Sequence, residues 1–238
     1  MILPTIRASF GRREALQLVE LLGRHDTELR DAALARLEES GLDALLDDPR
    51  VLNALLTEPD VNAPPGLVFY ALARHALLEG GIDDARVADH VASLLVTFGR
   101  ERRAYHISDT DPEEFHYLVD LVIRMGEAEE GRAFLLRTHL GNFALWLAGL
   151  FPDYLERRTR RGGPPLDYYE RMGITGYRMA ADSRQAESLG VGSLYRDVST
   201  HFSGVRSALN RISDRYLWPD SGDPVGRLLR EVSGRPPT

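Results

Sequence analysis

The chain has no cysteine and no lysine, and each absence excludes a class of chemistry. All 29 of its lysine-or-arginine positions are arginine. Without thiols, the chain can form no disulfide, zinc–thiolate centre, iron–sulfur cluster or cysteine nucleophile. Without an amine side chain, it has no Schiff-base lysine, no lysine general base and no lysine for a Walker-type phosphate loop.

Long hydrophobic runs are missing as well. The longest apolar stretch covers residues 140–151, and its 12 residues include Asn142, whereas a membrane span needs about 18 residues or more. The N-terminal residues show no apolar segment followed by a cleavage site, so we expect no secretion signal. The sequence therefore predicts a cytoplasmic protein that does not engage a membrane.

Charge is divided unevenly along the chain. The net charge is −7, yet residues 1–130 carry 25 acids and 13 arginines, whereas residues 131–238 carry 11 acids and 16 arginines. The acidic half argues against general nucleic-acid binding, and the basic half leaves a local anion site open.

Apolar residues recur at helical spacing throughout the chain, and no segment shows the alternation typical of a strand. We predict an all-α fold, a multi-helix bundle of roughly eight to ten helices. An N-terminal helical layer over residues 1–104 and a C-terminal bundle of long helices over residues 105–238 are expected to pack as one compact unit. The 238 residues are enough to bury a sizeable core.

In the first half, capping residues and glycines mark the expected helix ends. Asp26 can cap a helix that stops at Gly41, and Asp83 or Asp84 can start another. The segment 66–79 is apolar nearly all round, which predicts a buried helix. The helices expected in this half cover about 13–22, 27–40, 49–56, 66–79 and 84–98.

In the second half, Asp111 followed by Pro112 has the pattern of a helix start. A helix over 129–151 should end at Pro152, and two long helices over 168–189 and 193–217 should close the chain. The face expected to be buried after the Asp111 start carries Phe115, Leu118, Val119, Val122 and Met125. The small residues expected to let a neighbouring backbone approach closely are Gly141, Ala144, Ala148 and Gly149.

Several long motifs resemble a family of uncharacterised bacterial all-helical proteins. They are GNFALWLAGLFPDYL at residues 141–155, RGGPPLDYYERMG at 161–173 and LNRISDRYLWP at 209–219, with HALLEGGIDD at 75–84 in the first half. The resemblance covers most of the chain. It implies a bacterial origin and a single conjoined unit, and it implies no activity, cofactor or catalytic residue.

A first candidate site is a metal centre in the helical bundle. His116 and Asp120 are one helical turn apart, Glu113 lies one turn before them, and His139 lies on the following helix. Helical bundles hold metals with inward-pointing carboxylates and histidines, but the di-iron pattern needs Glu-x-x-His twice, and Glu113 with His116 supplies one copy. The alternative is a surface histidine paired with an acid, together with a histidine in the core.

A second candidate is an anion site at an arginine-rich corner, formed by Arg157, Arg158, Arg160 and Arg161. Guanidinium groups bind phosphate or carboxylate through paired hydrogen bonds, and tyrosines in the same half could stack on a nucleotide or a nucleic-acid end. The alternative is a solvated helix end whose arginines are stabilised by the helix dipole and by acids of the N-terminal half.

A third candidate is an interaction stripe at alternating spacings of four and three residues. Its members are Val198, Phe202, Val205, Leu209, Ile212 and Tyr216. Such spacing suits near-antiparallel packing, either within the chain's own bundle or against a partner helix.

The sequence contains no nucleophile constellation, no phosphate loop and no complete metal set. We therefore expect a non-enzymatic interaction or scaffold protein without a cofactor, which binds a protein partner or itself. The alternatives are a metal- or ligand-dependent helical enzyme with a cavity near His116, Asp120 and His139, and recognition of phosphate or nucleic acid at the corner of residues 157–161.

Overall fold

The computed structural model describes residues 2–58, 62–100 and 103–217, and every regular element in these ranges is helical. The predicted all-α fold is confirmed. The described residues form twelve α-helices rather than eight to ten, because the two long helices predicted at the C-terminal end are each divided. The end of the predicted C-terminal bundle, residues 218–238, lies outside the described residues.

The first five helices follow the capping residues closely. Asp26 accepts hydrogen bonds from the backbone N–H groups of Glu28 and Leu29, and Asp84 accepts from those of Arg86 and Val87. Gly41, with a φ of 78°, bends the second helix rather than ending it. These helices are α1 (Arg12–Leu22), α2 (Thr27–Leu46), α3 (Pro49–Thr57), α4 (Pro65–Glu79) and α5 (Ala85–Phe98).

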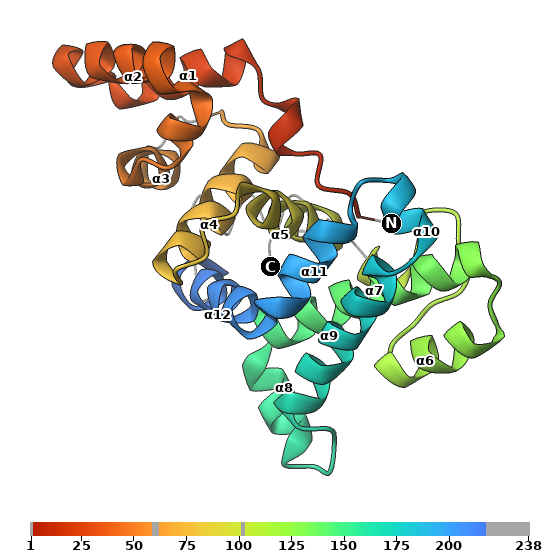
Figure 1. The fold of residues 1–238 in the computed structure, drawn as a ribbon. Coiled ribbons are helices and arrows are strands. Elements are labelled where there is room, and N and C mark those ends of the chain that lie inside the picture. Colours follow the sequence, from red (N-terminus) through yellow and green to blue (C-terminus); the bar gives the residue numbers. More distant parts are fainter. Residues whose placement is uncertain (1, 59–61, 101–102, 218–238) are drawn as a thin grey trace.

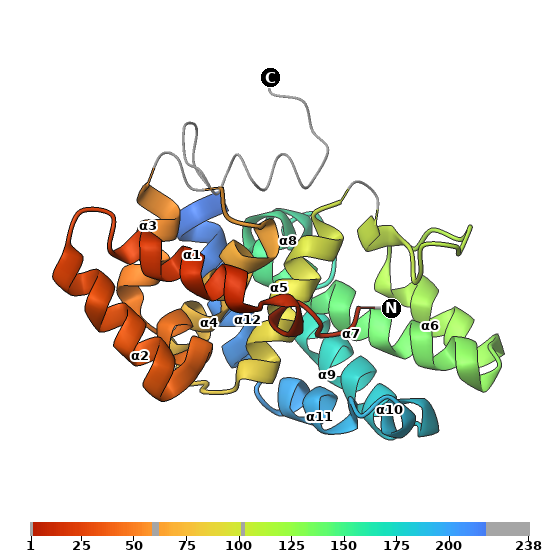
Figure 2. The same ribbon diagram turned by 90° about the horizontal axis from the view of Figure 1, so that it is seen from above.

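The core is built around α4, which is buried all round as its composition predicts: every residue from Leu67 to Leu77 is buried. Helix α12 (Phe202–Ile212) packs on α4 and also on α7 (Glu130–Leu150). One cluster of buried side chains therefore runs continuously across the boundary at residue 104. In Figures 1 and 2, α1–α3 lie at one end of the molecule, and α6 (Leu118–Glu127) lies at the opposite end.

The closest helix crossing lies between α7 and α9 (Leu166–Ala181). A Cβ placed on Gly176 would lie 2.7 Å from the backbone nitrogen of Gly141 and 2.8 Å from the carbonyl oxygen of Arg137. A Cβ on Gly149 would lie 2.7 Å from the Cβ of Leu209. The prediction that small residues of α7 let a neighbouring backbone approach closely is thus confirmed at Gly141, whereas at Gly149 the neighbour is the Leu209 side chain.

The two long helices predicted at the C-terminal end are each divided. Ser183 ends the first, because its hydroxyl accepts a hydrogen bond from the backbone N–H of Ala186 and starts a new helix. His201 separates α11 from α12 in the second. The pieces that follow α9 are α10 (Arg184–Ser188), α11 (Gly192–Thr200), α12 and a π-helical turn, η3 (Ser213–Leu217).

Among the helices in the described ranges, none is both long enough and apolar enough to cross a membrane. The apolar stretch at residues 140–151 forms most of the second half of α7 and packs inside the molecule, as its length predicts.

Candidate functional site

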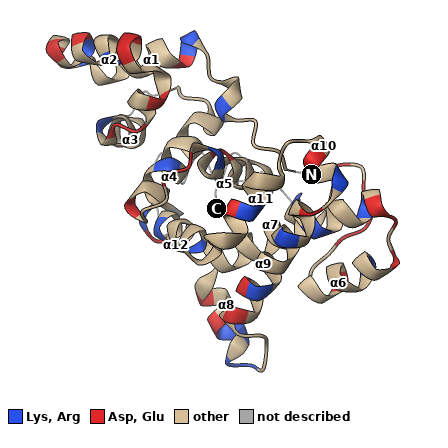
Figure 3. Cartoon of the chain, in the orientation of Figure 1, with Lys and Arg blue, Asp and Glu red and all other residues tan. Residues whose placement is uncertain are grey.

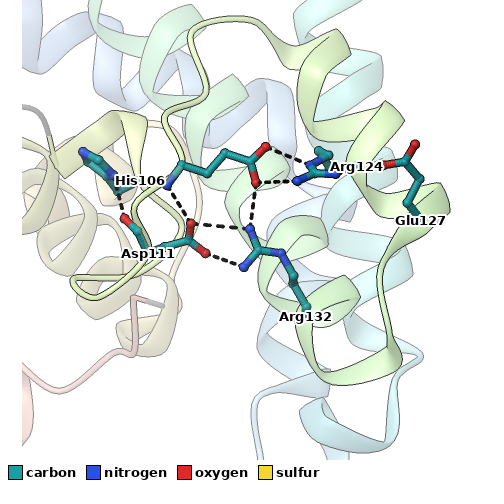
Figure 4. A network of polar contacts seen from close by, with 6 residues as sticks. His106, Asp111, Arg124, Glu127 and Arg132 are labelled. Carbon is teal, nitrogen blue, oxygen red and sulfur yellow. Dashed lines mark hydrogen bonds and ion pairs between the residues drawn. The ribbon is translucent and has the colours of Figure 1, made fainter.

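The segment around Asp111 does not begin a helix, so this prediction was wrong. Asp111 does accept a hydrogen bond from the N–H of Glu113, as a helix cap would, but the carboxylates of Asp111 and Glu113 both bind arginines. Arg132 binds Asp111 and Glu113, and Arg124 binds Glu113 at 2.8 Å (Figure 4). The N–H of Phe115 bonds the carbonyl of Tyr105 at 2.8 Å, which holds the chain extended until α6 begins at Leu118.

The predicted metal set is not assembled. Glu113 is bound by two arginines, and His116 lies 4.5 Å from the ring of Tyr105 and contacts Glu114 instead of Asp120. His139 is buried, with its ring stacked 5.8 Å from that of Phe143. In the part of the chain that the structure describes, no group of three or more potential ligands could hold a metal ion.

The centre of the molecule holds a short chain of buried polar groups that sequence reasoning missed. The Nε2 of His90 lies 2.9 Å from the hydroxyl of Tyr177, which donates to the Oδ1 of Asn142 at 2.8 Å. Burial lowers the pKa of His90 to about 4 and that of His139 to about 3, so both are neutral near pH 7. The sequence could have indicated this cluster through His90 and Asn142, because each is a polar residue within a largely apolar helical segment.

These buried groups do not line a ligand-sized cavity. A pocket beside Arg103, Thr138 and His139 has no space for a water molecule, and a second one beside Glu79 and Arg211 has space for about one. Small-molecule sites in proteins usually enclose several hundred cubic ångströms. Neither of these two pockets therefore supports an enzyme site near His139.

The arginine-rich corner lies at the end of α8 (Pro152–Thr159), and its four arginines do not converge. Arg160 pairs with Glu156 one turn earlier at 2.5 Å. The guanidinium of Arg158 lies over two tyrosine rings, 5.5 Å from the centroid of Tyr117 and 5.7 Å from that of Tyr154.

Arg157 and Arg161 are exposed, and neither has an ion-pair partner among the described residues. Among the described residues, the corner makes no ion pair with the acids of the N-terminal half, contrary to the alternative interpretation of its sequence. Instead, Arg86 bonds Asp197 at 2.8 Å, and Arg215 bonds Glu79 at 2.9 Å.

The predicted interaction stripe belongs to the core, so its assignment as a surface for a partner is corrected. All but the last of its residues are at most 1% exposed, because α11 and α12 turn this face toward α4, α7 and α9. Tyr216 is half-buried. The residues removed from the candidate interface on this ground are Val198, Phe202, Val205, Leu209 and Ile212.

A different surface collects exposed apolar side chains, and we name it the α6 surface. The described residues contain nine large exposed hydrophobic side chains, and five of them gather here. Arg158 contacts both Tyr154 on α8 and Tyr117 at the start of α6, and so links the two parts of this surface. The α6 surface consists of Tyr117 (54% exposed), Val119 (50%), Val122 (38%), Ile123 (58%) and, from α8, Tyr154 (44%).

The exposure of these side chains follows from the packing of α6. Leu118 and Leu121 are buried and Met125 is half-buried, and these residues pack α6 on α7. Val119, Val122 and Ile123, spaced by three and four residues, form a second apolar stripe on the other side of the helix. Figure 3 shows α6 at the edge of the molecule, and its charged residues are Asp120, Arg124 and Glu127. The sequence contained this second stripe, but we assigned Val119 and Val122 to the buried face.

Comparison of the chain with models of protein families, with curated proteins and with solved structures finds no match. The resemblance to a family of uncharacterised bacterial helical proteins stays a prediction.

Proposed function

We propose that this chain is a non-enzymatic helical interaction protein that binds a protein partner through the α6 surface. The observation that carries the proposal is the concentration of exposed apolar side chains on one short helix at the edge of the molecule. Contiguous apolar patches on a protein surface commonly mark interaction sites. Tyrosine and arginine, which adjoin the stripe here, are enriched in protein interfaces.

The rest of the described chain supports binding rather than catalysis. The buried rings of His90 and His139 contact aromatic rings or other buried polar groups and line no ligand-sized cavity. Its carboxylates around Asp111 are neutralised by Arg132 and Arg124. A helical core that leaves one apolar face of α6 exposed is a suitable arrangement for holding a partner.

The proposal can be tested by placing a photo-crosslinking amino acid at Val122 in the native host. Leu34 on α2 is a matched control, because it is also 38% exposed and lies at the other end of the molecule. We expect a discrete crosslinked adduct from position 122 and none from position 34. Equal labelling at both positions, or none at either, would refute the role of the α6 surface.

One observation favours a second candidate, which is recognition of a phosphate or nucleic-acid group. Arg157 and Arg161 are exposed beside Tyr154 and have no carboxylate partner among the described residues. Under this alternative, a labelled oligonucleotide binds with an affinity that falls as salt rises. Replacing both arginines with alanine should abolish that binding without changing the melting temperature.

A further inference from the structure

We propose that the partner of the α6 surface is a second copy of this chain, with α6 of the two copies packed antiparallel about a two-fold axis near Val122 and Ile123. This inference rests on the proposed function, because it names the occupant of the same surface. It follows from three properties of that surface: its shape, its charge and its size.

The shape of the α6 surface is complementary to itself. In an antiparallel pair centred between Val122 and Ile123, Val119 of each copy faces Gly126 of the other. The branched side chain of Val119 therefore meets a residue that has no side chain. A Cβ on Gly126 would meet nothing within 4 Å in its own chain. A glycine inside a helix is destabilising relative to alanine. The approach of a second helix would give Gly126 a packing role that no contact within its own chain provides.

The charges at the two ends of α6 are complementary in the same orientation. Arg158 contacts Tyr117 and thereby places the corner with Arg157 and Arg161 beside the N-terminal end of α6. The C-terminal end carries two exposed acids, Glu129 and Glu127, and Glu127 also pairs with Arg124 at 2.9 Å. Antiparallel pairing brings the arginines of each copy over the acids of the other, whereas parallel pairing would bring like charges together.

The size of the surface predicts a weak dimer. With ten residues, α6 is about 15 Å long, so its stripe alone buries less than the roughly 800 Å² per partner of a standard interface. Tyr117, Tyr154 and the arginines widen the contact on both sides of the axis. We expect a reversible dimer with a dissociation constant on the order of micromolar.

Sedimentation velocity of the full chain over a range of concentrations tests the dimer. We expect the weight-average mass to rise from monomer toward dimer. Ile123→Glu should raise the dissociation constant at least ~10-fold, since it places a charge at the centre of the contact. Leu34→Glu, at an exposed position remote from α6, should leave the constant unchanged. A wild-type chain that stays monomeric at its highest soluble concentration would overturn the dimer.

A charge exchange tests the orientation. The variant Glu127→Arg/Glu129→Arg makes both ends of the contact basic, and Arg157→Glu/Arg161→Glu makes both acidic. Each variant alone should dimerise more weakly than wild type, and an equimolar mixture should recover dimers that contain one copy of each. Circular dichroism and melting curves verify that both variants are folded. Dimerisation of each variant alone at wild-type strength, or no recovery on mixing, would overturn the antiparallel arrangement.

The crosslinking experiment separates the failure of this inference from the failure of the proposed function. An adduct at position 122 with twice the mass of the chain supports both. An adduct with a different protein, together with a monomeric wild-type chain in sedimentation, overturns the dimer and leaves the proposed interaction role standing. No adduct and no dimer overturn both.

Discussion

Tyr177 shows how single residues hold this fold together. Its hydroxyl joins His90 on α5 to Asn142 on α7, while its ring lies under the position that a Cβ of Gly141 would occupy. Each of these polar groups is fully or almost fully buried, so none can turn to bulk water if its partner is lost. A buried group left without a hydrogen bond costs more than the bond itself contributes.

We predict that Tyr177→Phe lowers the free energy of unfolding by about 1–3 kcal/mol, because it leaves His90 and Asn142 without their shared partner. Urea denaturation measures this difference directly. Tyr169→Phe is the control: Tyr169 is also buried, but it takes no part in this chain of hydrogen bonds, and its removal should change stability by a few tenths of a kcal/mol. Equal effects of the two variants would contradict the assigned role of the hydroxyl.

A second residue-scale prediction concerns the crossing of α7 and α9. Gly176→Ala should destabilise the chain by about 1–3 kcal/mol, because the new methyl group would meet backbone atoms of α7 that cannot rotate away. Gly131→Ala, where a Cβ meets nothing within 4 Å, should instead stabilise the chain by about 0.5–1 kcal/mol. Thermal melting of the two variants should therefore move in opposite directions from wild type.

At the scale of helices, the sequence predicts ends well where a side chain caps its own helix. Asp26 and Asp84 were identified from sequence, and both make the expected hydrogen bonds. The helix start predicted at Asp111 was wrong because its carboxylate binds Arg132, a residue 21 positions away. A local sequence pattern cannot indicate such a distant partner. The break at Ser183 was missed because the apolar spacing continues across it.

The candidate site was predicted less well than the helices. The stripe from Val198 to Ile212 was recognised as apolar, but its neighbours on α4 and α7 come from distant parts of the chain, so sequence spacing could not tell core from interface. The same limitation hid the α6 surface. The register of α6 is fixed by the anchoring of Phe115 and Leu118, which turns Val119 and Val122 outward.

We predict that Ser183→Ala destabilises α10 in particular. The hydroxyl donates to the carbonyl of Ala180 at 2.7 Å and accepts from the N–H of Ala186 at 3.1 Å, so it closes α9 and opens α10. Loss of such a cap costs about 0.5–2 kcal/mol. Hydrogen exchange should accelerate within Arg184–Ser188, and the exchange of α4 should change only by the global loss of stability. Unchanged exchange in α10 would contradict the capping role.

At the scale of the whole molecule, the two oppositely charged halves are joined mainly by apolar packing. Several ion pairs cross between them. Arg86 with Asp197 and Arg215 with Glu79 are substantially exposed and therefore contribute little each, whereas Arg132 pairs with the buried carboxylate of Asp111. The packing of α12 on α4 and of α6 on α7 supplies the most extensive helix contacts between the halves.

The buried histidines make the stability of the whole fold depend on pH. In the folded state His90 takes up a proton only near pH 4 and His139 near pH 3, whereas a histidine in the unfolded chain does so near pH 6.5. The unfolded state binds more protons in the window between these values, so stability falls as pH drops below about 6.5. The expected slope is roughly 1.4 kcal/mol per pH unit for each of the two residues.

Urea denaturation at several pH values between 7 and 5 checks this expectation. The pKa of Asp48 is held below its usual value by its hydrogen bond to Arg50, so its contribution is lost only at lower pH, outside this window. His139→Gln removes one of the buried histidines and should reduce the slope, even though it also lowers stability at pH 7. A slope that is flat in the wild-type chain would show that these histidines are not buried as described.

The near-contact of backbones at Gly141 and Gly176 also bears on ancestry. A larger side chain at either position must displace the opposite helix. Related proteins should therefore keep small residues at both positions, or else pack these two helices differently. Surface residues carry no such restriction and are free to drift. Distant kin of this chain should therefore be sought through paired small residues on two successive long helices, rather than through overall sequence identity.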